Sequence, residues 1–496
     1  MKRASAAARA ALLAVIPLLA MSFGPLSAQT VRATGATFAQ YVTLRSLVAD
    51  SVEVGATSGE GLLRRAADGA IVRCVTGEQY CRYLRAGSTL STAPLIQDLT
   101  LSAWGFGRGL RAYVQLRGRA GIGEDRDLWP RADDAFDVLV AYLELERARF
   151  RLRAGRQWKV SGLGYYNWDG GSVLVRVGPQ LQLEVYGGWS LARGLNEPVT
   201  GEALQAIEAF APDVRALLIG AQSTWRPTPL IAISALYQRE IRDDRRALYS
   251  ERIALDGSIR QGRVRLEGSL EVDAALRDLN DARFRAGIAL PHSLAADLFI
   301  RRYVPYFDLW TIWGAFDPIG FTEFGTTVAW RPAGRPIALS VDLARRSYPD
   351  AEAATTFGSA ESTGWRFGGT AAFRPDTVWS AQLRYHTDAG FGAGRNDLSA
   401  SLRRDLAAGR FVGARALLFE RAYEFRVQNG RVLGAGLDAG ARLGPRVHAE
   451  GGAAVYWHLG GDPGPGMDWS QVRGSLRLTW TVGPEPGMPG RAGGGR

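Results

Sequence analysis

The chain has 496 residues, with 60 Lys and Arg against 49 Asp and Glu, and its formal net charge at neutral pH is +11. A basic chain of this size could bind nucleic acid, but an N-terminal export signal argues against that partner. The sequence carries no phosphate-binding loop, dinucleotide fingerprint or metal-binding helix motif.

Residues 1–28 have the organisation of a secretory signal peptide. A positively charged region ending at Arg9 precedes the apolar run 10–20, and Ala28 supplies a small residue at a cleavage point. The run is too short for a stable membrane anchor. We therefore expect the mature chain to be exported and residues 29–482 to form one folded unit.

The clearest pattern is the alternation of polar and apolar residues over 262–274. Val264 and Leu266 fall on one side of this pattern, and Arg265 and Glu267 fall on the other. A β-strand turns successive side chains to opposite faces, so one face would be apolar and the other charged. A soluble β-sandwich also alternates, but the arginine-rich polar side recurs along most of the chain. This pattern indicates an outer-membrane β-barrel with lipid outside and a wet lumen.

The strand-like runs come in pairs joined by short turns, and longer links separate the pairs. In chain order the expected strands are 95–106, 110–120, 136–146, 147–154, 172–178, 181–191, 214–226, 229–240, 247–260, 262–274, 281–290, 293–302, 319–331, 335–346, 362–374, 377–387, 394–406, 410–422, 431–443, 446–458 and 469–482. Outer-membrane barrels place short turns in the periplasm and long loops outside the cell.

The direction of run 95–106 bears on the strand count. It ends at a short, periplasmic turn, so its start would be extracellular. If the N-terminus of the barrel is periplasmic, one earlier strand must cross the membrane outward. Thr34–Val48 is the candidate, which gives an antiparallel, up-and-down, all-β barrel of about 20–22 strands, with 22 favoured. Residues 50–94 then become an extracellular loop. The alternative is that residues 30–94 form a small lumenal or periplasmic piece of a smaller barrel.

Two segments outside the strands have recognisable composition. Residues 201–210 resemble a short helix within a long loop, and the Gly- and Pro-rich tail 483–496 is expected to be disordered. Cys74 and Cys81 are expected to form a disulfide, because the exported compartment is oxidising. No histidine lies near them, so the sequence gives no reason to expect a metal site or a cofactor.

The lumen-facing charges of the early strands are the main candidates for pore lining. Their order along the chain predicts Arg–Glu–Arg ladders across neighbouring strands, in which the first three arginines neighbour the two glutamates and these neighbour the last three arginines. The set is Arg111, Arg117, Arg119, Glu144, Glu146, Arg149, Arg151 and Arg153. Such ladders can hold a large barrel in shape, or they can create a transverse field that favours anions.

Two further segments admit two interpretations each. The aromatic run 303–321 could stack on sugars or form an interfacial girdle, and the acidic run 125–137 could bind calcium, although its spacing is not that of an EF-hand. Catalysis finds little support, because His386 lies near Asp388 but no G-x-S-x-G elbow supplies a nucleophile. We expect a non-enzymatic protein, with a barrel hydrolase as the remaining alternative.

The segment Gly155–Arg156–Gln157, followed by a loop and then Trp168–Asp169–Gly170, resembles porins of the alginate-export and related outer-membrane families. The resemblance extends only to about Trp189. It implies that loop 157–171 folds towards the pore, with Arg156 and Asp169 at the pore mouth. The alternative is that Asp169 belongs to a turn and Arg156 is a fixed ion-pair partner.

The export signal and the barrel pattern together imply a location and a role. The protein would lie in the outer membrane, in contact with its lipid and lipopolysaccharide, after insertion by the barrel assembly machinery. It would pass small polar solutes, including anionic and saccharide solutes. The competing interpretation is a structural or surface barrel whose lumen is occluded.

Overall fold

The computed structural model describes residues 30–484 except 60–62, 68–71, 107–108, 124–135, 192–215, 243–247, 305–319, 350–361, 391–392, 425–429 and 461–468. The expected signal peptide, the short helix at 201–210, almost all of the tail and most of the aromatic and acidic runs lie outside these residues. No helix in the described part of the chain is long and apolar enough to span a membrane.

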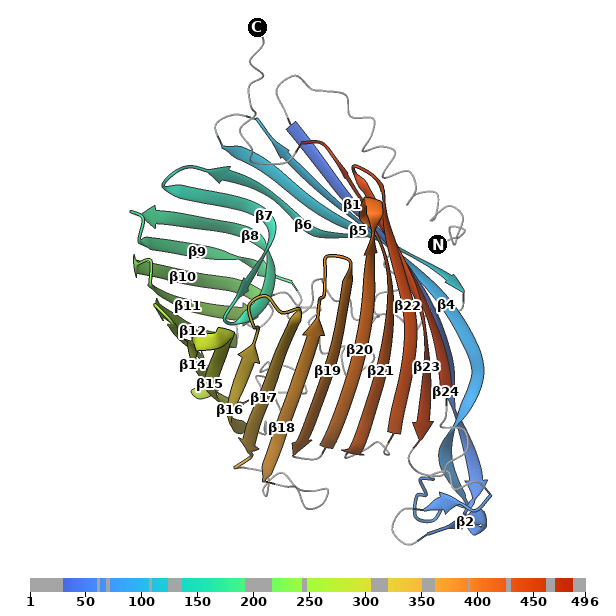
Figure 1. The fold of residues 1–496 in the computed structure, drawn as a ribbon. Helices are drawn as coiled ribbons and strands as arrows, with labels where there is room; N and C mark the ends of the chain where they lie inside the picture. Colours follow the sequence, from blue (N-terminus) through green and yellow to red (C-terminus); the bar gives the residue numbers. More distant parts are fainter. Residues whose placement is uncertain are drawn as a thin grey trace.

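Twenty-two of the described strands form one closed antiparallel sheet, as the sequence predicts, and two short strands form a separate small sheet. The barrel closes because β1 (Thr30–Glu53) pairs with β24 (Trp469–Val482) on one side and with β4 (Tyr80–Trp104) on the other. The wall from β4 to β24 is shown in Figure 1. Its other strands are β5 (Leu110–Gly123), β6 (Phe136–Glu146), β7 (Phe150–Ser161), β8 (Gly164–Val177), β9 (Leu181–Ser190), β10 (Ala216–Thr228), β11 (Ile231–Arg242), β12 (Leu248–Gln261), β13 (Val264–Asp273), β14 (Asp278–Leu290), β15 (Leu294–Tyr303), β16 (Phe321–Trp330), β17 (Ile337–Ser347), β18 (Thr363–Phe373), β19 (Trp379–Gly390), β20 (Ala393–Leu406), β21 (Arg410–Glu424), β22 (Gly430–Gly444) and β23 (Val447–Gly460).

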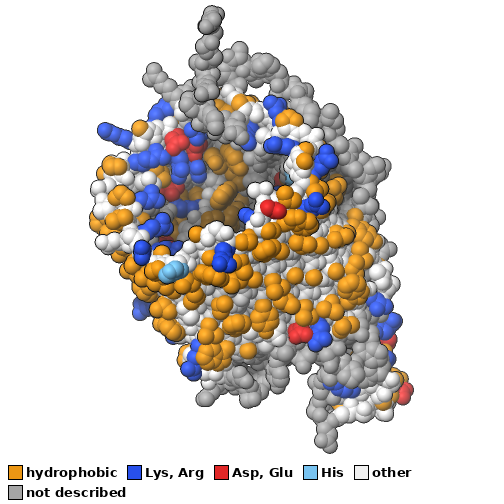
Figure 2. All heavy atoms as spheres, viewed as in Figure 1, with side chains coloured by type: hydrophobic (Ala, Val, Ile, Leu, Met, Phe, Trp, Pro, Cys, Tyr) orange, Lys and Arg blue, Asp and Glu red, His pale blue; other side chains and the backbone are white. Residues whose placement is uncertain are grey.

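The two faces of the wall differ as the alternation predicts. In β15, Leu298 and Ile300 are 52% and 47% exposed on the outside, whereas the ring of Phe299 between them lies 5.6 Å from the Arg366 guanidinium on the inside. Figure 2 shows apolar side chains over the outer wall and charged ones gathered in the barrel opening. A continuous apolar exterior around a closed ladder of backbone hydrogen bonds suits a bilayer, where no water can satisfy free backbone groups.

β1 and β4 extend beyond the rest of the wall as a two-stranded ribbon. β1 pairs with β24 only as far as Val42 but pairs with β4 out to Glu53, so the expected loop 50–94 shrinks to residues 54–79. The ribbon ends in a small folded cap, which Figure 1 shows around β2 (Thr57–Ser58). The predicted Cys74–Cys81 disulfide is confirmed there.

The region 147–177 differs from the sequence expectation. β7 and β8 are both longer than expected, and the expected loop 157–171 is instead a β-hairpin with its turn at Gly162 and Leu163. The strand pattern is hard to recognise there because glycines and aromatic residues replace the usual polar–apolar alternation. The hairpin is the main irregularity of the wall.

The assignment of faces on β13 gives the first prediction. Leu266→Arg should lower the free energy of unfolding by roughly 2–4 kcal/mol, because it places a charge against lipid. Glu267→Gln on the lumen face should cost less than about 1 kcal/mol, since Glu267 makes only an exposed ion pair with Arg265 at 3.4 Å. Reversible unfolding in lipid vesicles measures both values, and equal penalties would contradict the assigned faces.

Candidate functional site: the inward hairpin and the lumen charges

The hairpin of β7 and β8 leaves the wall and turns into the lumen. β7 pairs with β6 only up to Arg156, and β8 pairs with β9 only from Trp168 onward. Residues 157–167, the inward hairpin, therefore pair mainly with each other; at the base Gln157 pairs with Trp168, and the Asn167 carbonyl accepts a hydrogen bond from the Leu191 N–H at 2.9 Å. In Figure 1 the β7–β8 ribbon curves away from its neighbours.

An apolar cluster holds the inward hairpin against the inner wall. Leu163 and Tyr166 of the hairpin, together with Trp168 at its base, are buried against one lumen-facing side chain from each of four successive strands. Those wall residues are Tyr186, Leu218, Leu236 and Ala254 of β9 to β12. The rings of Trp168 and Tyr186 lie 4.9 Å apart. Burying these side chains favours the folded-in position, because each buried large apolar side chain contributes about 1.5–3 kcal/mol.

Polar contacts anchor the same hairpin. Lys159 places its Nζ 2.6 Å from Glu184 and 4.7 Å from the centre of the Tyr186 ring. Near the tip, Arg252 of β12 donates to the Leu163 carbonyl at 3.2 Å and to the Tyr166 hydroxyl. The hairpin is thus held at its middle and at its tip.

A row of glycines allows the wall to fold at this point. Gly155, Gly170 and Gly188 face one another across β7, β8 and β9. Gly155 and Gly188 have φ values of +125° and +154°, and a Cβ on Gly170 would lie 2.6 Å from the Cα of Gly188. Only glycine allows both this backbone conformation and this close approach.

Arg156 and Asp169 lie at the base of the inward hairpin. Arg156 contacts both carboxylate oxygens of Asp169, at 2.7 and 2.9 Å, and donates from Nη1 to the Val138 carbonyl of β6 at 2.8 Å. Val138 lies on the stretch of β6 that β7 has already left. The guanidinium therefore supplies a hydrogen bond that the departing strand no longer provides. Asp169 belongs to β8 and not to a turn.

Part of the expected charge ladder forms. Glu144 contacts Arg153 at 2.7 Å and Arg111 at 3.8 Å, so an Arg–Glu–Arg row crosses β5, β6 and β7. Glu146 contacts Arg111 at 3.4 Å and Arg176 at 2.9 Å. The described structure thus joins these carboxylates to arginines of three strands.

The other expected charges have different partners. Arg117 pairs with Asp98 at 2.7 Å, and Arg119 pairs with Asp137. The reason is register: Arg111 lies opposite Glu144 in the antiparallel pair, so Arg117, farther along β5, lies opposite Asp137 and cannot reach Glu144.

The two remaining arginines on the β6–β7 side also differ from one another. Arg151 lies 3.7 Å from Glu184 in β9. Arg149 was expected on a lumen strand, but it is exposed in the turn 147–149, because β7 begins only at Phe150. Arg149 therefore sits at the rim of short turns.

A second charged wall was not singled out from the sequence. Asp281 contacts Arg283 and lies 3.0 Å from Arg301, while Glu323 contacts Arg346 and lies 3.0 Å from Arg366. Arg283, Arg301, Glu323 and Arg366 line a 720 Å³ hollow on the inner face of β10 to β16, the β10–β16 hollow. The same alternation that marks the early strands also runs through this region and could have identified it.

Comparisons with known proteins give only distant structural likenesses. No family model and no curated protein matches the chain. The translocation pore of the P pilus usher PapC aligns over 92% of this chain and 100% of its own, with 8% identity and a TM-score of 0.42. OprD from Pseudomonas aeruginosa covers 91% and 94%, with 11% identity and a TM-score of 0.36. OccAB1 from Acinetobacter baumannii covers 91% and 96%, with 8% identity and a TM-score of 0.38.

The glycine row gives the second prediction. Gly155→Ala should lower the free energy of unfolding by about 1–3 kcal/mol or more, because φ is positive and the new Cβ would meet the β6 backbone. Gly171→Ala is the control, since its Cβ would lie 3.5 Å from the Arg153 carbonyl, an ordinary contact. Denaturant titration in vesicles compares them. If the Gly155 variant were as stable as the Gly171 variant, the bend at which the hairpin leaves the wall would not need this glycine.

Proposed function

We propose that the protein is an outer-membrane channel for small polar solutes, including anionic and saccharide solutes. The observation that carries the proposal is the inward hairpin, which packs on the inner wall of β9 to β12 and narrows the lumen. Barrels of 22 strands have wide lumens that need a plug or a constriction to be selective. A constriction made by part of the wall leaves room beside it for solutes.

The charge of the lumen supports passage of anions. Arg226 and Arg285 line the β10–β16 hollow and are exposed there. Within the described residues, no carboxylate lies within ion-pairing distance of either guanidinium. Unneutralised arginines on a lumen wall raise the local concentration of anions.

The setting of the channel follows from the same proposal. The outer wall would contact outer-membrane lipid and lipopolysaccharide after insertion by the assembly machinery, and the ribbon cap would face outward from the cell. The likeness of residues 155–170 to alginate-export porins agrees with a solute pathway beside the hairpin. A structural barrel with an occluded lumen is the competing function, and a barrel hydrolase is a more distant one.

The third prediction tests conduction and the role of the hairpin. The purified protein in a planar bilayer should give discrete single-channel currents. Gln157 and Trp168 face each other, so an Asn-Gly turn can replace residues 158–167, and this variant should conduct more. Shortening the turn 274–277 in the same way is the control and should leave conductance unchanged. A native protein without currents would favour the occluded barrel. Equal conductance in the native protein, the hairpin variant and the turn variant would show that the hairpin does not restrict the solute pathway.

The fourth prediction concerns selectivity. The double variant Arg151→Gln, Arg153→Gln leaves the carboxylates of Glu144 and Glu184 without these partners, so the reversal potential in a salt gradient should shift towards cations. The shift should shrink at 1 M salt, where the Debye length is about 3 Å. Arg149→Gln, at the rim, is the control and should shift the potential less. An unchanged potential in the double variant would mean that these arginines only hold the wall together.

A further inference from the structure

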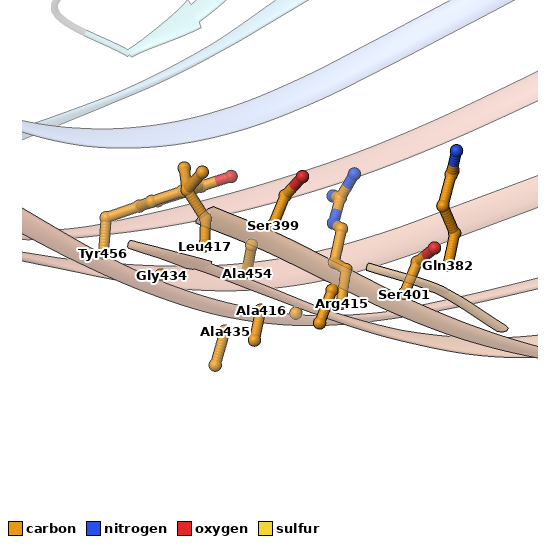
Figure 3. Close-up of a pocket in the computed structure, with 12 residues that line it drawn as sticks. Gln382, Ser399, Ser401, Arg415, Ala416, Leu417, Gly434, Ala435, Ala454 and Tyr456 are labelled. Atoms are coloured by element: carbon orange, nitrogen blue, oxygen red, sulfur yellow. The ribbon is translucent and has the colours of Figure 1, made fainter. Parts of the chain in front are cut away.

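The inner face of β19 to β23 contains a second hollow, the β19–β23 hollow, with a volume of 330 Å³. In Figure 3 the side chains of Gln382, Ser399, Arg415 and Tyr456 point to one side of the sheet, and Ala416 points to the other. Known ligand sites have volumes of about 300–1,000 Å³, so this hollow is large enough for a small solute.

The strand register arranges the lining side chains in two adjacent rows across the sheet. One row is Gln382, Ser401, Arg415, Gly436, Ala454 and Arg473. The next row is Arg384, Ser399, Leu417, Gly434, Tyr456 and Gln471. Each row therefore contains hydrogen-bonding groups, at least one arginine and a small residue near its centre.

The small residues make the surface concave. Gly434 and Gly436 carry no side chain, and the small side chain of Ala454 is buried. Tyr456 lies flat over Gly434, since a Cβ there would be 2.7 Å from the Tyr456 Cδ1. The ring fills the space above Gly434 and forms a wall of the hollow, and the side chain of Arg415 lies over Gly436, where a Cβ would be 3.0 Å from its Nε.

The charge of the two rows is positive. They contain Arg384, Arg415 and Arg473, all exposed, and no carboxylate. Within the described residues none of the three guanidiniums lies within ion-pairing distance of an acidic group. Arg473 lies over the Tyr456 ring at 5.0 Å. The closest carboxylate along β22 is Asp438, which lies over Gly413 in the next row.

The hollow also faces the constriction. The closed sheet has 22 strands, so strands eleven places apart in its order lie on opposite sides of the lumen. β21 at the centre of the hollow is eleven places from β10, and β10 is one of the strands on which the inward hairpin packs. A solute that passes beside the hairpin would therefore move along the wall that contains the hollow.

We propose that the β19–β23 hollow is a binding subsite for small polyhydroxylated anions, such as sugar acids or sugar phosphates. Arg415 is the central anion-binding group, because an arginine without an acidic partner can donate to a carboxylate or phosphate with full strength. Ser399, Ser401 and Gln382 can bond to the solute's hydroxyl groups. This inference rests on the proposed channel function and names the class of solute that the channel favours.

The test uses gluconate and glucose 6-phosphate as probes, with glucose and acetate as controls that lack the charge or the hydroxyl groups. Each probe should block single-channel current at lower concentration than either control. In Arg415→Gln the dissociation constant for both probes should rise about ten- to a hundredfold, as expected for the loss of a charge-assisted hydrogen bond. Arg149→Gln, which removes an equal charge at the rim of short turns, should change it less than about twofold.

The outcomes separate the subsite from the channel. Equal effects of the Arg415 and Arg149 variants would overturn the subsite and leave only the general charge of the protein. If acetate blocked the current as strongly as gluconate does, Ser399 and Ser401 would have no role in binding the solute's hydroxyl groups. Ligand-detected NMR on the protein in detergent measures gluconate binding without any current. Binding that depends on Arg415 in a protein that does not conduct would support the subsite and reject the channel.

Discussion

The rest of the structure depends on one constraint, that a wall placed in lipid must satisfy its own backbone hydrogen bonds. β1 meets it by pairing with both β24 and β4, which closes the sheet. The constraint is hardest to meet where β7 leaves β6 and an edge opens. There Arg156 donates to the exposed Val138 carbonyl, and Asp169 holds the guanidinium in position. An ion pair at the base of a hairpin thus repairs a gap in the ladder.

The inward hairpin combines features that rarely occur together in a barrel wall. Its backbone can leave the sheet only because Gly155, Gly170 and Gly188 are in register, and glycine in a strand weakens that strand. The apolar cluster around Trp168 and the anchors at Lys159 and Arg252 offset this weakness. The lumen side of the wall there is apolar, unlike its charged neighbours, because it serves as the packing surface for the hairpin.

The sequence was sufficient to predict the strand count, because alternation with a period of two survives in nearly every strand and the turn lengths fix the direction of each. The resemblance implied that segment 157–171 folds towards the pore, but the sequence was not sufficient to predict that this segment is a β-hairpin, since a row of glycines is visible only once three strands are in register. The partners of Arg117 and Arg119 also depend on register, which shifts between Gln115 and Leu116 of β5. Both are properties of paired strands, which a single strand's sequence does not specify.

The arginines of the lumen fall into two groups that differ in their availability to solutes. Those near the hairpin, such as Arg153 and Arg156, are already bonded to carboxylates and hold neighbouring strands together. Some of those in the two hollows, such as Arg285 and Arg415, have no acidic partner among the described residues, whereas Arg283, Arg301 and Arg366 of the β10–β16 hollow are paired. A guanidinium in an ion pair must break that pair before it can bind an anion, whereas an unpaired one gives up only water. The arginines most visible in the sequence are therefore mainly structural, and the unpaired ones facing the hollows are better placed to bind solutes.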